Sequence, residues 1–272
     1  MDPLIISCAL TGALATPKEN ASLPFDPEAI GRDALEAARA GAAIVHIHAR
    51  EDDGTPAWET KYFERTLDVI RAENKDVLVN LTTGFGGTED IDWEIRFAPL
   101  PLHPELASFD AGSMNFGPWM FRNSPDFLAA LAKRMLDEGV KPELEIFDTG
   151  QIGNVMRLVG EGVIPEPLWF QFVLGVAGGA PATLRNLAHL VGELPPGASW
   201  SVAGVGRYQL PMNVYAIAMG GHARTGLEDN LWIRKGESAT NGTLVSRVRS
   251  LAEQMERPVA TPAQAREILG LG

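Results

Sequence analysis

Short apolar runs rich in β-branched residues alternate with longer amphipathic stretches along nearly the whole chain. Runs of this length and composition favour buried strands, and the stretches between them favour helices. Eight runs are predicted as strands, over residues 4–10, 44–49, 77–81, 106–110, 143–147, 168–174, 199–203 and, with a weaker pattern, 219–223. The alternation is typical of parallel strand–helix units rather than of hairpins.

Helices are predicted between these strands, and their ends carry recognisable signals. The predicted helices cover residues 27–40, 59–73, 89–97, 124–138, 149–160, 182–190, 208–218 and 242–255. Asp26 and Ser124 each precede a proline, the arrangement of a capping residue followed by a first turn that needs no N–H. Gly41 and Gly139 stand where two of the helices end, because glycine tolerates a left-handed conformation.

Eight strand–helix pairs in one chain of 272 residues predict an α/β fold, the closed (β/α)8 TIM barrel. We expect a single catalytic domain over residues 1–272, in which residues 261–271 form a final capping helix. The glycine-rich stretches 84–87 and 175–179 follow predicted strands, and so lie on the face where barrel active sites are built. Neither stretch matches a dinucleotide-binding or P-loop motif.

Composition narrows the class of protein further. The formal net charge is −12, whereas binding of nucleic-acid phosphates needs clustered basic residues, so we expect no nucleic-acid partner. No apolar stretch approaches the roughly 18 residues that span a bilayer, and Asp2 stands where a secretory signal would be basic. We therefore expect a cytoplasmic protein without a membrane segment. The single cysteine, Cys8, is interpreted as a packing residue of the first strand.

Two histidines form the sharpest local pattern. His46 and His48 alternate with apolar residues near the end of the second predicted strand. Residues i and i+2 of a strand face the same side, so both imidazoles can converge on one point, where neutral imidazole is a favoured ligand of Zn²⁺. The alternative interpretation is a pair of satisfied polar side chains on the barrel interior.

A carboxylate that completes such a site is available near the other end of the chain. Glu228 and Asp229 follow the eighth predicted strand. In a closed barrel this strand lies beside the first, which lies beside the histidine-bearing second strand. Because two histidines leave a catalytic zinc one protein ligand short, we expect this acidic pair to reach the same mouth.

Several separate motifs, in one order over nearly the whole chain, resemble the β-keto acid cleavage enzyme family. Besides the histidine strand they are CALTGA at 8–13, NLTTG at 80–84, FDAGSMNF at 109–116, PELEIFD at 142–148 and ARTGLEDN at 223–230. The resemblance implies a reaction in which a β-keto acid and acetyl-CoA give acetoacetate and a new acyl-CoA. By analogy it also implies a homo-oligomer, a tetramer.

The resemblance assigns roles to individual residues. The residues implied to bind Zn²⁺ are His46, His48 and Glu228. Arg224 and Asp229 correspond to the catalytic dyad, and Glu145 falls at a position that supports the reaction. The alternative for these three charged groups is a structural ion-pair network at the barrel mouth. Arginine has a pKa above about 12, so Asp229 must take part if the dyad is the base. The sequence leaves open which atom receives the proton.

Three hydroxyl residues are implied to contact substrate. They are Thr82, its neighbour Thr83, and Ser108. The alternative for Thr82 and Ser108 is a hydroxyl at a strand end that caps the following turn. Leu14 stands where a family member acting on an aminated substrate places a Glu that pairs with the amino group. Because an ammonium would lose its charge partner there, we expect a more apolar or differently charged substrate, unless another acid such as Glu19 replaces that Glu.

Two competing functions stay open at this point. One is another metal-dependent carbon–carbon lyase, an aldolase or a hydrolase on the same barrel, since this scaffold hosts many chemistries. It predicts activity without any thiol ester. The other is a metal-binding or scaffold protein without catalytic activity.

Overall fold

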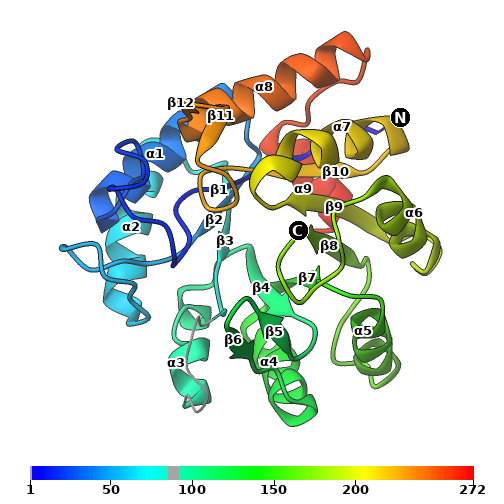
Figure 1. Ribbon diagram of the computed structural model, residues 1–272. Coiled ribbons are helices and arrows are strands. Elements are labelled where there is room, and N and C mark those ends of the chain that lie inside the picture. Colours follow the sequence, from blue (N-terminus) through cyan, green and yellow to red (C-terminus); the bar gives the residue numbers. More distant parts are fainter. Residues whose placement is uncertain (1, 85–91) are drawn as a thin grey trace.

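The chain forms a closed barrel of eight parallel strands (Figure 1). The computed structural model describes residues 2–84 and 92–272. Around the barrel the order is β1-β10-β9-β8-β7-β4-β3-β2, and β2 pairs again with β1. The barrel strands are β1 (Ile6–Ala9), β2 (Ile44–Ile47), β3 (Leu78–Leu81), β4 (Leu106–Asp110), β7 (Lys141–Ile146), β8 (Trp169–Leu174), β9 (Ser199–Gly204) and β10 (His222–Thr225). The prediction of a (β/α)8 TIM barrel is confirmed.

Helices surround these strands, and the last of them along the chain lies across an end of the barrel (Figure 1). They are α1 (Pro27–Ala40), α2 (Thr60–Glu73), α3 (Trp93–Phe97), α4 (Pro125–Glu138), α5 (Gly150–Gly160), α6 (Leu184–Gly192), α7 (Gln209–Met219), α8 (Asn241–Gln254), α9 (Pro262–Leu269) and the 3-10 helices η1 (Leu100–Leu102) and η2 (Gly206–Tyr208). Asp26 and Ser124 cap α1 and α4 by accepting a hydrogen bond from a backbone N–H of the first turn. Gly41 and Gly139 end these helices, as predicted. In residues 2–84 and 92–272 no helix has the length and apolar character that crossing a bilayer requires.

The eighth strand begins three residues later than predicted. Met219 is the last residue of α7, and Gly220, with a φ of 83°, ends that helix in a left-handed conformation. A short apolar run before a glycine suits a helix end as well as a strand, which is why its pattern misled. The shift places Arg224 inside β10, where its side chain is buried.

Two predictions fall partly outside the described residues. Of the predicted helix 89–97, the structure describes α3 (Trp93–Phe97), which Asp92 caps by accepting a hydrogen bond from the N–H of Glu94. Of the glycine-rich stretch 84–87, it describes Gly84 alone, and residues 85–91 lie outside the described residues.

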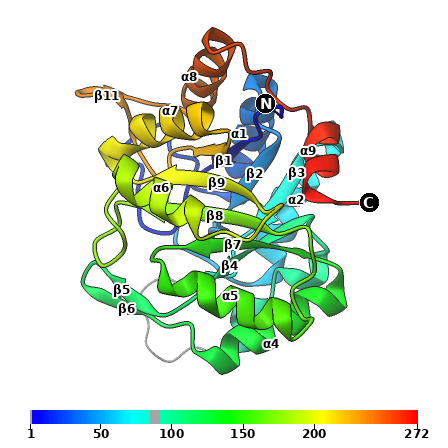
Figure 2. The ribbon, with the colours of Figure 1, turned by 90° about the vertical axis from the view of Figure 1, so that its right-hand side faces the viewer.

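Two antiparallel hairpins at the C-terminal ends of the strands were not predicted (Figure 2). One consists of β5 (Met114–Phe116) and β6 (Trp119–Phe121), and the other of β11 (Trp232–Arg234) and β12 (Glu237–Ser238). The glycine-rich stretch 175–179 packs against the first hairpin. A Cβ at Gly178 would lie 2.0 Å from the backbone oxygen of Asn115, so only glycine allows this approach.

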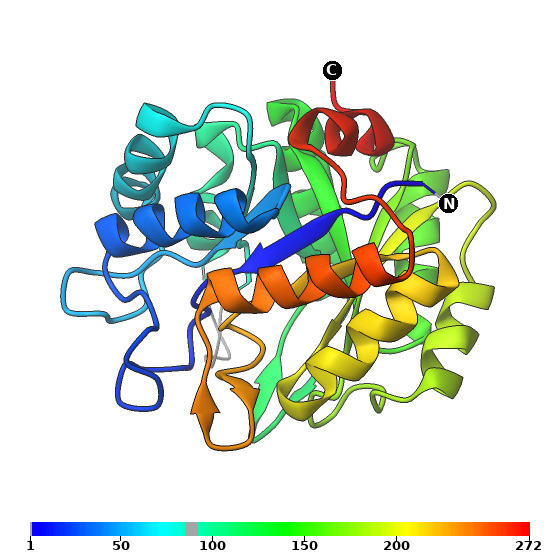
Figure 3. The same ribbon diagram turned by 90° about the horizontal axis from the view of Figure 1, so that it is seen from above.

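The opposite end of the barrel is closed by α9. Its Ala265 and Leu269 are buried in an apolar cluster with Ile44, Leu78 and Leu106, all near the N-terminal ends of their strands. Figures 2 and 3 show α9 on the side of the barrel away from the two hairpins. The hairpin end is therefore the open face of the barrel.

Candidate active site

A pocket of about 420 Å³ opens at the C-terminal ends of the barrel strands. Nine of the ten residues selected from the sequence line it, and Thr83 does not. The nine are Leu14, His46, His48, Thr82, Ser108, Glu145, Arg224, Glu228 and Asp229. Most come from barrel strands or from the first residues after them, the part of a TIM barrel that carries catalytic groups.

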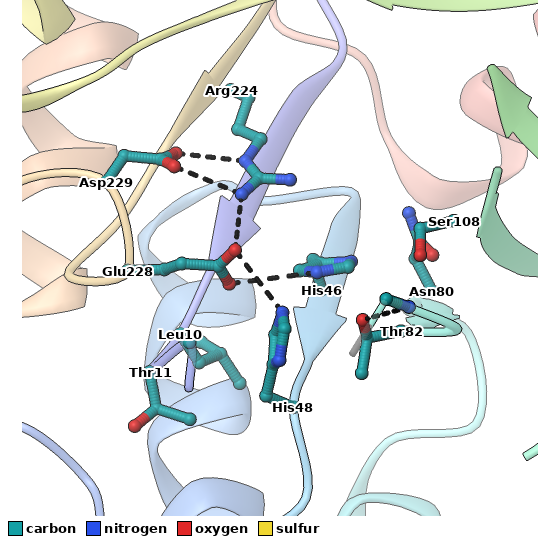
Figure 4. Close-up of polar contacts among 12 residues, drawn as sticks. Leu10, Thr11, His46, His48, Asn80, Thr82, Ser108, Arg224, Glu228 and Asp229 are labelled. Atoms are coloured by element: carbon teal, nitrogen blue, oxygen red, sulfur yellow. Dashed lines mark hydrogen bonds and ion pairs between the residues drawn. The ribbon is translucent and has the colours of Figure 1, made fainter. Parts of the chain in front are cut away.

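His46, His48 and Glu228 meet at one point of this pocket (Figure 4). The potential ligand atoms of the three side chains all lie within 4.8 Å of one another. Glu228 Oε2 is 3.7 Å from His46 Nε2, and Glu228 Oε1 is 3.4 Å from His48 Nε2. The convergence expected from the alternation of β2 is confirmed.

Glycines around the loop after β10 allow Glu228 to reach this position. Gly226 has a φ of 134°, and a Cβ there would lie 2.0 Å from the backbone oxygen of Ala9. Gly12, on the loop after β1, faces Glu228, where a Cβ would come within 2.6 Å of Cγ. Two positions without side chains therefore let the β10 loop fold over β1 toward β2.

The surroundings of His46 and Glu228 favour the protonation states that bind a cation. Burial lowers the pKa of His46 to about 3, so its imidazole is neutral and has a lone pair to offer. Burial alone would raise the pKa of Glu228, but Arg224, His48 and His46 hold it well below its usual range. Glu228 is thus an anion among two histidines, and its Oε2 has no hydrogen-bond partner in the part of the chain that the structure describes.

The three side chains fit a divalent metal. Two nitrogens and one carboxylate oxygen are a ligand set of catalytic zinc sites, which keep a further position for water or substrate. Ligands about 2.1 Å from a tetrahedral ion lie about 3.4 Å apart, close to the two contacts that Glu228 makes with the histidines. The buried, unpaired Oε2 of Glu228 is the kind of atom that a cation satisfies.

Arg224 joins the metal-ligand candidates to two further acids, Glu145 and Asp229, and Figure 4 shows its contacts with Glu228 and Asp229. It donates two hydrogen bonds to Asp229, from Nε to Oδ2 at 2.9 Å and from Nη2 to Oδ1 at 3.1 Å. Nη2 also donates to Glu228 Oε1 at 2.7 Å, and Nη1 to Glu145 Oε1 at 3.3 Å. One guanidinium therefore connects three carboxylates, and all four groups line the pocket.

Burial disfavours the charged form of each group in this network, and the charges of the neighbouring groups act against burial. Burial lowers the pKa of Arg224, but Asp229, Glu228 and Glu145 outweigh it and raise the pKa well above the usual value. For Asp229 burial wins over Arg224, and the pKa is raised. The guanidinium thus stays protonated, while the carboxyl group of Asp229 has become more basic.

Asp110 belongs to the same site and was not selected from the sequence. It lines the pocket, is the register partner of Glu145 and lies 3.8 Å from Arg96, measured from Oδ2 to Nη2. Burial raises the pKa of Asp110, and burial together with Asp110 raises that of Glu145 well above its usual value. One signal was present, because Asp110 ends a predicted strand two residues after Ser108 and so shares its face.

Comparison with known proteins places this arrangement in a family. Residues 3–271 match the family described as beta-keto acid cleavage enzyme. The chain belongs to the β-keto acid cleavage enzyme family. It is 44% identical to 3-keto-5-aminohexanoate cleavage enzyme of Acetoanaerobium sticklandii, over 100% of this chain and 99% of that enzyme. It is 40% identical to 3-oxoadipate:acetyl-CoA acetyltransferase of Cupriavidus necator, over 99% of this chain and 95% of that protein.

A solved structure resembles the fold of this family member. The binary complex of ObcA with oxaloacetate superposes with a TM-score of 0.79 and 22% sequence identity, over 92% of this chain and 68% of that one. At this level of identity the likeness concerns the fold alone.

The hydroxyl residues of this family member show the capping contacts that were the alternative interpretation. Thr82 Oγ1 accepts a hydrogen bond from the N–H of Gly84 at 3.0 Å, and Ser108 Oγ accepts one from the N–H of Thr83 at 3.0 Å. Thr83 Oγ1 donates to the backbone oxygen of Ser108 at 2.7 Å, and Thr83 does not line the pocket. Thr82 and Ser108 still have their hydroxyl protons to donate, so substrate contact stays a prediction for both.

The remaining wall of the pocket is apolar. Leu14 is 58% exposed and lines the pocket together with Phe116, Trp119 and Phe121 of the β5–β6 hairpin. Glu19, the other acid considered for this region, is not among the lining residues and accepts hydrogen bonds from Thr16.

Proposed function

We propose that the chain is a zinc-dependent enzyme that cleaves a β-keto acid with acetyl-CoA to acetoacetate and a new acyl-CoA. One observation carries the proposal: a metal-ligand set and a buried acid–base network share the same pocket, joined through the contact between Arg224 and Glu228. Family membership supports it, as does the relative named 3-oxoadipate:acetyl-CoA acetyltransferase. A separate lyase or hydrolase reaction has no observation of its own in its favour.

The proposed reaction exchanges one carbon–carbon bond and one carbon–sulfur bond. The carbon between the carboxylate and keto group of the β-keto acid loses a proton and attacks the acetyl carbonyl. That attack makes the new carbon–carbon bond of acetoacetate, and the thiolate of CoA leaves. The old bond to the keto carbon then breaks as the thiolate takes the remaining acyl group, and the carbon released as part of acetoacetate takes the proton back from the base. No oxidant or reductant is needed.

We assign a separate role in this reaction to each group of residues in the pocket. His46, His48 and Glu228 would hold the zinc ion, which would supply Lewis-acid polarisation of the keto oxygen, a contribution of several kcal/mol. Arg224 keeps its proton, so the base is Asp229, whose raised pKa suits it to accept one. The bidentate contact with Arg224 orients the Asp229 carboxylate.

Glu145 has a complementary role. Its pKa is raised well above the usual value by burial and by Asp110, so we assign it as the neutral acid of the site. In that state it donates a hydrogen bond to an oxygen that gains negative charge. Two carboxyl groups whose environments separate their roles are a recurring arrangement in acid–base catalysis.

The experiment is an incubation of purified protein with acetyl-CoA and a panel of β-keto acids. Acetoacetate and new CoA esters are followed by mass spectrometry, with and without zinc after removal of metal by a chelator. We expect both products in equal amounts, dependent on acetyl-CoA and on metal. Product formation without acetyl-CoA would instead establish a lyase or hydrolase. By family analogy we also expect a homotetramer, which light scattering tests against the 29.3 kDa monomer.

Leu14 gives the proposal a test of specificity. We propose that the apolar side chain favours an acyl substituent without a positive charge. Because Leu14 is largely exposed, a charge introduced there is screened, and an ion pair of this kind is worth less than about 1 kcal/mol. We expect Leu14→Glu to raise the preference for an aminated over an aliphatic β-keto acid about 2–5-fold. Leu14→Gln is the matched control and should leave that ratio unchanged.

A further inference from the structure

Asn80 lies beside the metal-ligand candidate His46, on the neighbouring strand of the barrel. The two residues are register partners on β3 and β2, and both side chains are buried. In Figure 4, His46 lies between Glu228 on one side and Asn80 on the other. Asn80 therefore lies on the side of the imidazole that is opposite Glu228.

Each of these two residues has one buried polar atom without a hydrogen-bond partner among the described residues. They are Nδ1 of His46 and Oδ1 of Asn80. Such pairs of neighbouring orphans are rare in folded proteins, because an unsatisfied buried donor or acceptor costs about 1–3 kcal/mol. A proton on Nδ1 would satisfy both atoms at once.

A hydrogen bond to Glu143 fixes the orientation of the Asn80 side-chain amide. Its Nδ2 donates to Glu143 Oε1 at 2.5 Å. Glu143 also accepts from Trp169 Nε1 at 2.9 Å and from Gln171 Nε2 at 2.9 Å. Glu143 Oε1 thus accepts from the side-chain amides of both Asn80 and Gln171, so the NH₂ end of Asn80 faces the carboxyl group. Oδ1 then occupies the other side of the amide.

The orienting chain continues across the barrel. Gln171 is itself held by Ser201, whose hydroxyl donates to Oε1 at 3.0 Å. The side chains Glu143, Gln171 and Ser201 come from the adjacent strands β7, β8 and β9, and Asn80 comes from β3, which β4 separates from β7. A flip of the Asn80 amide would place two acceptors face to face at Glu143.

The histidine itself needs this orientation. An imidazole that binds a metal through one ring nitrogen is neutral and carries its single proton on the other nitrogen. Nε2 faces Glu228 at 3.7 Å, beyond hydrogen-bond distance, and is the nitrogen available to a metal. Only the tautomer with the proton on Nδ1 leaves Nε2 free to bind.

We propose that Asn80 is a positioning residue, whose Oδ1 accepts the Nδ1–H of His46 and thereby holds His46 in the metal-binding tautomer. The inference rests on the metal site of the proposed function. Groups that orient ligating histidines in this way typically contribute 10–100-fold to metal affinity.

The first measurement needs no metal and no variant. In metal-free protein with ¹⁵N-labelled histidine, long-range ¹H–¹⁵N correlation spectra report the tautomer of each of the five histidines. His46→Gln identifies the signals of His46 by their loss. We expect the Nδ1–H tautomer in the unaltered chain, and the Nε2–H tautomer would overturn the inference even if every Asn80 variant failed to fold.

The second measurement is zinc affinity by competition with a chelator. We expect Asn80→Ala to bind zinc about 10–100-fold more weakly, whereas Asn186→Ala, the same change on the outer helix α6 and outside the pocket, stays within twofold of the unaltered chain. Unchanged affinity in Asn80→Ala would overturn the inference. If the unaltered chain bound no zinc, the proposed function would fail, and the tautomer would still decide the role of Asn80.

Discussion

The two ends of the barrel are built from the same strands but carry opposite kinds of side chain. Near the N-terminal ends Ile44, Leu78 and Leu106 form part of an apolar cluster beneath α9. Two residues further along these strands stand His46, Asn80 and Ser108, all buried and all polar. Because alternate strand residues share a face, each of these strands places an apolar residue and then a polar one inside the barrel. One layer serves packing, and the next serves chemistry.

His222 and His46 show the same contrast in a single residue type. Burial lowers the pKa of each to about 3. His222 Nδ1 accepts a hydrogen bond from the N–H of Ile5 at 2.9 Å, and its ring lies against Trp169 with the centroids 5.2 Å apart. His222 is therefore a satisfied packing residue, not a neighbour of the metal site. Equal burial and equal pKa do not distinguish a structural histidine from a functional one, whereas the hydrogen-bond partners do.

The largest expected effect comes from replacing these two histidines in turn. We expect His46→Ala to lose bound zinc and to lower kcat/KM about 10³-fold or more, because the metal contributes several kcal/mol. We expect His222→Ala to keep zinc and to lower the free energy of unfolding by about 2–4 kcal/mol, through a cavity and an unpaired N–H. Metal analysis, steady-state kinetics and urea unfolding separate the two. If His222→Ala lost zinc and His46→Ala kept it, the assignment of a functional role to His46 and a structural role to His222 would be wrong.

The next effect tests the acid–base network at the open end. We expect Asp229→Asn to lower kcat about 10²–10³-fold while zinc stays bound, because an amide cannot accept the proton. Asp148→Asn, an exposed change after β7 outside the pocket, is the control and should leave kcat unaltered. If Asp229→Asn were about as active as the unaltered chain, the ion-pair network would have a structural role only.

At the closed end the expected effect is on stability alone. Leu269 of α9 is 1% exposed, so we expect Leu269→Ala to cost about 2–5 kcal/mol of unfolding free energy and to leave kcat/KM unchanged. Glu267→Ala, at an exposed position of the same helix, should change stability by less than about 0.5 kcal/mol. A changed kcat/KM in folded Leu269→Ala would show that the two ends are coupled.

The smallest effect concerns a titrating group outside both layers. Burial raises the pKa of Asp33 from 3.8 to about 6, although a hydrogen bond from Asn241 lowers it. The unfolded chain thus ionises at lower pH than the folded protein, so Asp33 reduces stability increasingly as pH rises from about 4 to 6. We expect Asp33→Asn to gain about 1–2 kcal/mol at pH 8 and nothing below pH 4. A gain independent of pH, measured by urea unfolding, would contradict this.

Local patterns predicted most of the fold. The eight strands and the ends of α1 and α4 follow from short-range rules of burial and capping, and only β10 was placed three residues early. The hairpins were not predicted, because Trp119 and Trp232 are exposed and the short strands around them have no buried face to impose an alternating pattern.

Some residues of the site could likewise be predicted from local sequence patterns, and others could not. His46 and His48 follow from a two-residue period within one strand, whereas the role of Glu228 came from family resemblance and depends on the closure of β10 beside β1. Asp110 and Asn80 matter through their register partners, Glu145 and His46. Register between strands is set by the whole barrel, so these contacts were beyond a sequence pattern.

Anomalous diffraction at the zinc edge, from crystals grown with zinc, decides whether the two histidines and the glutamate bind one ion. We expect one strong peak within about 2.0–2.2 Å of one atom each of His46, His48 and Glu228. If these three side chains share no peak, the metal site does not exist.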